Sequence, residues 1–381
     1  MPVPNATEFT ATSNGGGTWQ NPGIWSISPS GGQGFPDNTG GDTYRVTING
    51  NPSYNLNADV TITSLNVASG MTFQNAANRN FTVVGDFIST SGTLVTASAV
   101  TLFFNGDSEV NSRMDLRNGA RLLNNGNMVV GPLGAGFHDQ DFALPSAQGF
   151  SLVNNGTVVG DRPGTTTFRN FSILNTGTIE VRQGTFQAEG FTQTNATAHI
   201  RVLTGAELRA NALTFNGGTV VASGSTLNGS SFTFRNSTLI IGEGIGDISS
   251  LTLAGNAAGD AGQDATFRFS LAGTAAGQFD TLAIVNGMNF NGLTLDIETL
   301  NGFEPTETDV FRIITGNNLS NGNFANATGN LLDVPDVGTF TITRNNQFVE
   351  LGNFIPIPEP SMPALLAAGA AVLGLRRRQA R

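Results

Sequence analysis

The sequence predicts an all-β protein, a right-handed parallel β-helix built as a solenoid with coils of about 20 residues. Composition is the first reason. Charged residues make up 12% of the chain, about half the usual share for a globular domain, while 39% hydrophobic residues are too many for a disordered one. The second reason is a repeat in which turn residues precede a short β-branched run, and the third is that no segment before residue 356 shows a helical period.

The repeat is clearest in the middle of the chain, where six segments such as "NNGTVVG" share the turn-then-strand form. A small residue precedes each strand, and these residues lie 30, 21, 19, 22 and 19 positions apart: Gly126, Gly156, Gly177, Ala196, Gly218 and Ser237. A unit of this size cannot bury a core alone and must stack on its neighbours. Asn stands two positions earlier at 124, 154, 175 and 216, where stacked coils would align the amides as a ladder. Ordinary turn chemistry of Asn is the alternative explanation.

The pattern divides the chain into four parts. Residues 1–55 are expected to form an N-terminal cap or coil entry and residues 56–255 the β-helix, because Gly70 and Gly92 extend the 20-residue spacing backwards. Residues 256–355 contain longer runs with period-two alternation, which indicate antiparallel strands or wider final coils that cap the solenoid. Residues 356–381 form a distinct tail. Trp19 and Trp25, the only tryptophans, are expected to plug the first coil, with stacking on a sugar ring as the alternative.

The one long step of the repeat contains an insertion at residues 131–149, predicted to protrude as a loop. It carries His138, Asp139 and Asp141, residue types that bind metal ions or transfer protons. A solvated loop is the simpler interpretation. The only other histidine, His199, is expected on a strand, so a site with two histidines is not expected.

Charge and cysteine content exclude several functions. Outside the last six residues, 14 Arg stand against 28 acidic residues and no Lys is present, so nucleic acid is not an expected partner. Without Cys there can be no disulfide, thiolate nucleophile or cysteine-zinc site. No cofactor is expected. Turn chemistry explains the aspartates of "NGDSEV", "AGDAGQD" and "TETD", and weakly held surface calcium is the alternative interpretation.

Catalysis is not expected either. Parallel β-helices include polysaccharide lyases, but such sites need carboxylates or basic residues that converge on one face. Here the acidic and basic residues of the middle coils are dispersed: Asp161, Glu180, Glu189 and Glu207, with Arg162, Arg169, Arg182, Arg201 and Arg209. A non-enzymatic protein is the leading interpretation, and a lyase is retained as an alternative.

The tail begins with Pro358, Glu359 and Pro360, continues through twelve uncharged residues at 364–375, and ends in a basic cluster: Arg376, Arg377 and Arg378. As a helix, the apolar stretch would be about 18 Å long, short of the roughly 30 Å hydrocarbon core of a bilayer. It is therefore expected to be a short hydrophobic helix that inserts only transiently into a membrane, with the arginines on the cytoplasmic side.

The order of these three parts at the C-terminus resembles the PEP-CTERM sorting signal of Gram-negative bacteria that produce exopolysaccharide. The resemblance implies export, processing by a membrane enzyme of the exosortase type, and an extracellular or cell-surface location. The stretch around Trp19 and Trp25 also resembles the coil entry of autotransporter-like β-helices, and residues 277–316 resemble the strand-rich unit that precedes PEP-CTERM tails. Because "MPVPNATEFTATSNGGG" has no basic n-region or apolar h-region, we expect the export signal to lie upstream of Met1.

Together these features predict a structural β-solenoid of the bacterial surface or biofilm matrix, associated with exopolysaccharide. A carbohydrate-binding or lyase-like β-helix that uses the 131–149 insertion is the first alternative, and an adhesin is the second.

Overall fold

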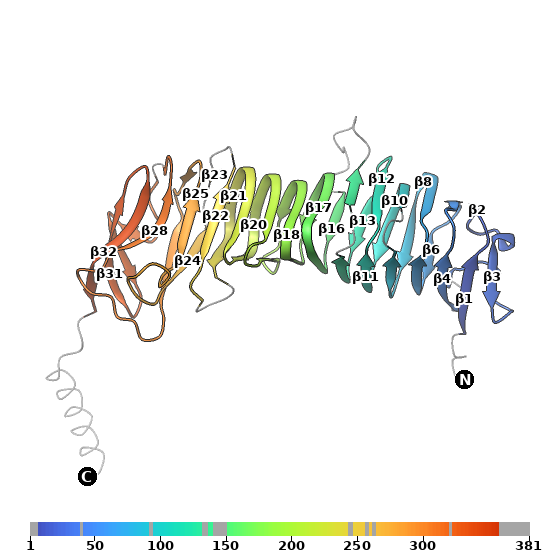
Figure 1. The fold of residues 1–381 in the computed structure, drawn as a ribbon, viewed down its shortest axis with the longest axis horizontal. Coiled ribbons are helices and arrows are strands. Elements are labelled where there is room, and N and C mark those ends of the chain that lie inside the picture. Colours follow the sequence, from blue (N-terminus) through green and yellow to red (C-terminus); the bar gives the residue numbers. More distant parts are fainter. Residues whose placement is uncertain are drawn as a thin grey trace, which may run out of the picture.

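The computed structural model describes residues 7–38, 41–90, 94–131, 136–139, 151–242, 247–255, 259–260, 264–319 and 322–357. It is an all-β solenoid, drawn out into a rod with the N-terminal coils at one end and the C-terminal strands at the other (Figure 1). The described residues contain a single 3-10 turn, η1 (Pro22–Ile24), and no α-helix. The helix expected in the tail lies outside the described residues.

Parallel strands stack in three ladders that run along the rod, and from the coil of β4 onward the middle coils contribute one segment to each ladder. The first ladder consists of β1 (Glu8–Ser13), β4 (Thr43–Ile48), β7 (Ser64–Val67), β9 (Phe87–Ser89), β11 (Asp107–Val110), β14 (Asn127–Val130), β19 (His199–Val202), β24 (Thr266–Leu271), β27 (Thr294–Thr299) and parts of four long strands, β17 (Thr157–Asn175), β18 (Thr178–Gln193), β20 (Glu207–Ala222) and β21 (Ser225–Ile241).

The second ladder consists of β2 (Gly17–Thr18), β5 (Ser53–Asn55), β8 (Met71–Val83), β10 (Leu94–Phe104), β12 (Arg113–Arg117), β15 (Gly136–Asp139), β22 (Ser250–Ala254), β25 (Thr281–Ile284), β28 (Phe311–Gly316) and the four long strands. The third consists of β6 (Val60–Ile62), β13 (Arg121–Asn124), β16 (Leu152–Asn154), β23 (Gly259–Asp260), β26 (Met288–Asn289) and parts of β8, β10 and the four long strands.

The register confirms the repeat and corrects one position in it. In the first ladder, partners from Asp107 to Thr238 follow one another at 20, 30, 21, 21, 20 and 19 residues. His199 pairs with Thr178 and Thr219, so the residue equivalent to Gly177 and Gly218 is Ala198. The choice of Ala196 was wrong, because the turn before His199 is two residues longer than assumed, closed by Ala198 N–H donating to Asn195 O at 3.0 Å.

The Asn ladder is present, with one correction. Asn124 Nδ2 donates to Asn154 Oδ1 and Asn154 Nδ2 to Asn175 Oδ1, both at 2.8 Å, inside a core that leaves all three side chains fully buried. Gln193 occupies the next rung and accepts from Asn175 Nδ2 at 3.2 Å. Asn216 is not a member, because the register aligns Gln193 with Phe215 and leaves Asn216 exposed.

Aromatic side chains fill the interior on either side of this amide ladder. Phe104 precedes Asn124 in the register, and Phe215 and then Phe234 follow Gln193, with the last two ring centroids 4.8 Å apart. Parallel coils place register partners above one another, so phenylalanines at the same position of successive coils pack ring against ring.

The two ends of the rod close in different ways. At the N-terminal end Trp19 and Trp25 are buried at 4.6 Å between ring centroids, as expected for a plug, and β3 (Trp25–Ser28) pairs antiparallel with the outer edge of β1. Parallel pairing therefore starts at β1, ahead of residue 56.

At the C-terminal end both expected arrangements occur in succession. The first ladder continues from Thr238 to Thr266 and Thr294 in wider steps of 28 residues. Antiparallel strands follow: β29 (Ala327–Thr328), β30 (Leu331–Val334), β31 (Gly338–Arg344) and β32 (Phe348–Pro356), which also pairs with β28. The side-chain amide of Asn326 completes the edge of β27, accepting from Leu295 N–H at 3.1 Å and donating to Leu295 O at 2.8 Å.

Candidate binding surface

The predicted sorting motif cannot be placed in space. The residues of this motif lie outside the described part of the chain: Pro358, Glu359, Pro360, Arg376, Arg377 and Arg378. Asp141 of the insertion also lies outside it. The described chain ends at Ile357, directly after β32, at the C-terminal end of the rod (Figure 1).

His138 and Asp139 lie on β15, which corrects the prediction of a protruding loop for residues 136–139. Phe137 is fully buried and stacks on Phe168 at 4.3 Å between ring centroids, so this segment is a rung of the second ladder. The register places His138 between Asp115 and Arg169 of the neighbouring coils. The side chains of His138 and Asp139 lie outside the described structure.

Asp115, on β12, is a buried charge that the sequence patterns did not reveal. It is 1% exposed although it points to the outer side of the second ladder, because Arg113 and Arg117 flank it on the same strand. Arg113 Nε and Nη2 donate to its two oxygens at 2.6 and 3.1 Å, and Arg117 Nη2 lies 3.6 Å from Oδ2. The alternation in "RMDLR" was the available signal, since residues two apart on a strand share a face.

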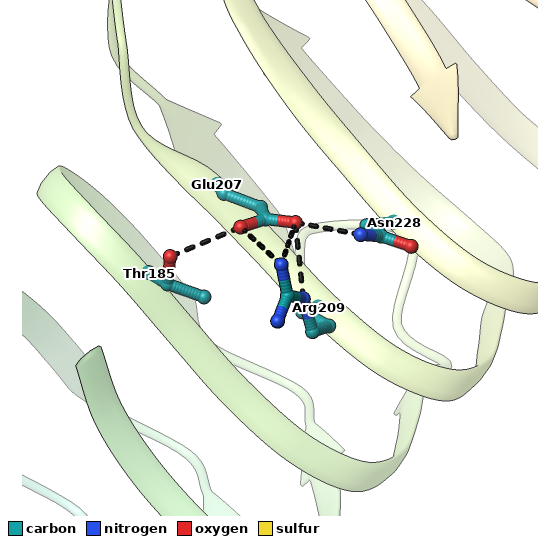
Figure 2. A network of polar contacts seen from close by, with 4 residues as sticks. All are labelled: Thr185, Glu207, Arg209 and Asn228. Carbon is teal, nitrogen blue, oxygen red and sulfur yellow. Dashed lines mark hydrogen bonds and ion pairs between the residues drawn. The ribbon is translucent and has the colours of Figure 1, made fainter. Parts of the chain in front are cut away.

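A second polar cluster lies further along the same ladder (Figure 2). Arg209 Nη2 donates to both oxygens of Glu207 at 2.8 and 2.9 Å, while Thr185 and Asn228, from the coils on either side, donate at 3.0 and 2.8 Å. Burial alone would raise the pKa of Glu207, but the hydrogen bonds from Asn228, Arg209 and Thr185 and the charge of Arg209 together lower it. Glu207 is therefore ionised at neutral pH.

The dispersed charges of the middle coils form local pairs on the outer surface. Arg182 Nη2 donates to Glu180 Oε2 at 3.1 Å, and Arg201 Nη1 approaches Oε1 of the same carboxylate to 3.8 Å. Burial and the nearby charge of Arg201 lower the pKa of His199, so its imidazole is neutral at pH 7. Each carboxylate of these clusters has a cation beside it, which suits hydrogen bonding to a ligand better than proton donation.

One carboxyl is unlike the others. Asp280 is fully buried and accepts from the backbone N–H groups of Ser249 and Ser270 at 2.7 and 2.6 Å. Desolvation raises its pKa to about 7. It joins two coils from within, out of reach of any ligand on the surface.

Comparison of the chain with protein-family models, curated proteins and solved structures found no match. Among the residues that the structure describes, no three or more His, Asp or Glu side chains gather closely enough to hold a metal ion. The same residues include no helix with the length and apolar character needed to cross a bilayer. In "TETD", Asp309 accepts from Thr306 N–H at 2.7 Å, which is turn chemistry.

Proposed function

We propose that the protein is an exported structural β-solenoid that stands on the bacterial surface or in the extracellular matrix, in contact with exopolysaccharide. The proposal includes a right-handed coil, the usual hand of parallel crossovers, and a C-terminal strand region that acts as a cap. The exosortase-type enzyme is the proposed processing partner, with transient insertion of the tail in the inner membrane.

The continuous stacking of three parallel ladders is the observation that carries the structural role. Neighbouring coils are joined by backbone hydrogen bonds throughout, by the buried amides in the four coils from Asn124 to Gln193, and by packed phenylalanines such as Phe137–Phe168 and Phe215–Phe234. Such a rod gains stiffness from the sum of identical contacts between neighbours. Its edges are covered by β3 at one end and by β32 and Asn326 at the other, which favours a rod of fixed length over strand addition between copies.

Polar chemistry supports a passive surface over a catalytic one. Asp115, Glu180 and Glu207 each lie beside at least one arginine on the same face. The alternative of a carbohydrate-binding or lyase-like β-helix is favoured by the backbone register, which aligns Asp115, His138 and Arg169 at one position of consecutive coils. Adhesion to other cells is the weaker alternative.

Fractionation of the native host tests the proposal. Wild-type protein is expected in the surface or extracellular fraction with a mass lower than that of the unprocessed chain. The triple variant Pro358→Ala, Glu359→Ala, Pro360→Ala is expected to accumulate unprocessed in the membrane fraction, whereas the exposed-surface control Asn211→Ala behaves as wild type. Wild-type protein in the cytoplasm would refute the proposal, and cleavage of exopolysaccharide by the purified chain would replace it with the lyase.

A further inference from the structure

Four consecutive coils repeat one surface pattern where the third ladder leads into the first. The segments are Asn105–Asp107, Asn125–Asn127, Asn155–Thr157 and Thr176–Thr178, and each has Gly at its centre. The first residues of the four segments form one row and the last residues form a second, since the register aligns Asp107, Asn127, Thr157 and Thr178. We call this pair of rows the amide–hydroxyl track.

The first row is ordered by its own hydrogen bonds. Asn125 Nδ2 donates to Asn105 Oδ1 and Asn155 Nδ2 to Asn125 Oδ1, both at 2.8 Å, and Thr176 Oγ1 donates to Asn155 Oδ1 at 2.7 Å. The three asparagines are exposed, and each amide has a second N–H and a second oxygen lone pair. Because the side chains are already fixed, a ligand does not have to order them on binding.

A row of bare backbone separates the two polar rows. A Cβ at Gly126, Gly156 or Gly177 would lie 2.1 Å from the carbonyl oxygen of the preceding glycine in the stack. The glycines therefore cannot be replaced without moving the coils, and they keep the two polar rows apart. Within each row, successive side chains lie one coil apart, a spacing of about 4.8 Å along the rod.

The second row also borders a shallow hollow of about 450 Å³ on the first ladder. Asp107 and Asn127 line it together with the apolar side chains of Ile88 and Val129. Ile88 is 43% exposed, so its apolar side chain is available to a ligand in the hollow. Apolar side chains framed by hydrogen-bonding groups suit a sugar ring, which has an apolar face and a rim of hydroxyls.

Charge excludes an acidic polysaccharide from this surface. Asp86, Asp107 and Glu109 line the hollow, so an acidic glycan would meet three carboxylates on a body that is already strongly negative. Amides and hydroxyls, by contrast, pair with neutral hydroxyls as both donors and acceptors. A repeat of one polar pair per coil matches a polymer of identical units better than the irregular surface of a folded protein.

We infer that the amide–hydroxyl track and the adjoining hollow bind a neutral polysaccharide chain laid along the axis of the rod. The inference rests on the proposed function, in which the protein contacts exopolysaccharide, and it names the surface and the class of ligand. Neighbouring coils bind successive sugar units, so affinity grows with chain length.

Binding to an insoluble neutral β-glucan, compared with an acidic polyuronate and the cationic polymer chitosan, tests the inference. The purified full chain is expected to bind the neutral glucan, with an affinity that does not change between low and high salt. The double variant Asn125→Ala, Asn155→Ala is expected to bind about tenfold more weakly, because two of the four rungs lose their amide. The double variant Thr157→Val, Thr178→Val keeps the side-chain volume and is also expected to weaken binding.

A matched control removes two side-chain amides that lie outside the amide–hydroxyl track. Asn80 and Asn211 are exposed asparagines whose Nδ2 atoms donate across coils, to Asp59 at 3.1 Å and to Glu189 at 2.5 Å. The variant Asn80→Ala, Asn211→Ala should bind as wild type. Equal binding by all three double variants, or preference for the polyuronate or for chitosan with loss in high salt, would overturn the inference. Surface localisation separates the two proposals: a protein that reaches the surface without binding the glucan refutes only the inference, and one that binds the glucan but stays in the cytoplasm refutes only the proposed function.

Discussion

Removal of one rung from the buried amide ladder should destabilise the rod far more than removal of its exposed neighbour. Asn154 is fully buried and makes three hydrogen bonds at 2.8 Å: it accepts from Asn124 Nδ2 and donates to Asn175 Oδ1 and to the carbonyl of Thr178. In Asn154→Ala these three partners lose a hydrogen bond in a place that water does not reach.

The magnitude follows from that count. Three buried hydrogen bonds at about 1 kcal/mol each, with a small cavity left by the amide, give a loss of about 3–4 kcal/mol in the free energy of unfolding. Asn155→Ala is the matched control, because Asn155 is exposed and its bonds to Asn125 and Thr176 can be replaced by water. The control should lose less than about 1 kcal/mol.

Urea denaturation of the two variants provides the first measurement, and hydrogen exchange of the backbone amides in β17 and β18 provides the second. Exchange is needed because coils of a solenoid can open locally, so a single transition does not have to report every rung. If Asn154→Ala shifts the urea midpoint no more than Asn155→Ala, and the amides of both strands keep their protection, the buried ladder does not stabilise the coils as argued.

Three further changes test other parts of the molecule. Gly156→Ala would place a Cβ 2.1 Å from Gly126 O and should lower the melting temperature strongly. Gly15 has open space around it, so the control Gly15→Ala should leave the melting temperature unchanged. Equal effects of the two substitutions would contradict the close stacking of the coils. The pKa of Asp280 is raised from 3.8 to about 7, so its contribution to the stability of the fold is present in acid and is lost as pH rises through 7. The free energy of unfolding should therefore fall by up to about 4 kcal/mol between pH 4 and pH 7. Asp280→Asn should flatten this dependence on pH, and an unchanged slope would contradict the assignment. The pKa of Glu207 is lowered, so its contribution has the opposite sign and is lost as pH falls below 4.5; Glu207→Gln should remove that part of the acid sensitivity seen in denaturation curves.

Much of the fold could be predicted because short sequence patterns within each coil determine where its turns and strands lie. Turn residues before short β-branched runs, repeated at about 20 residues, are sufficient for stacked coils, and the positions of Asn124, Asn154 and Asn175 in that repeat were sufficient for the amide ladder. The burial of Trp19 and Trp25 also followed from their place at the start of the solenoid.

Errors arose where the length of a turn changes. The longer turn before His199 displaced the assigned position from Ala198 to Ala196. One extra residue in the turn before Thr219 put Asn216 two positions before Gly218, whereas the ladder position in that coil is Phe215. The insertion was taken as a loop throughout, although Phe137 pairs with Phe168 and makes residues 136–139 a strand. A single sequence shows the spacing of a repeat but not which residue absorbs an extra position.

The sequence by itself determined the class of fold, the approximate length of the coils and the acidic, cysteine-free composition of the body. Only the tertiary structure decided which side chains meet across coils: the burial of Asp115 between two arginines, the cluster around Glu207, and the alignment of the amide–hydroxyl track. The reason is physical. Contacts along one strand follow from the alternation of side chains, whereas contacts between coils depend on the register, and a shift of one residue moves every side chain to the other face.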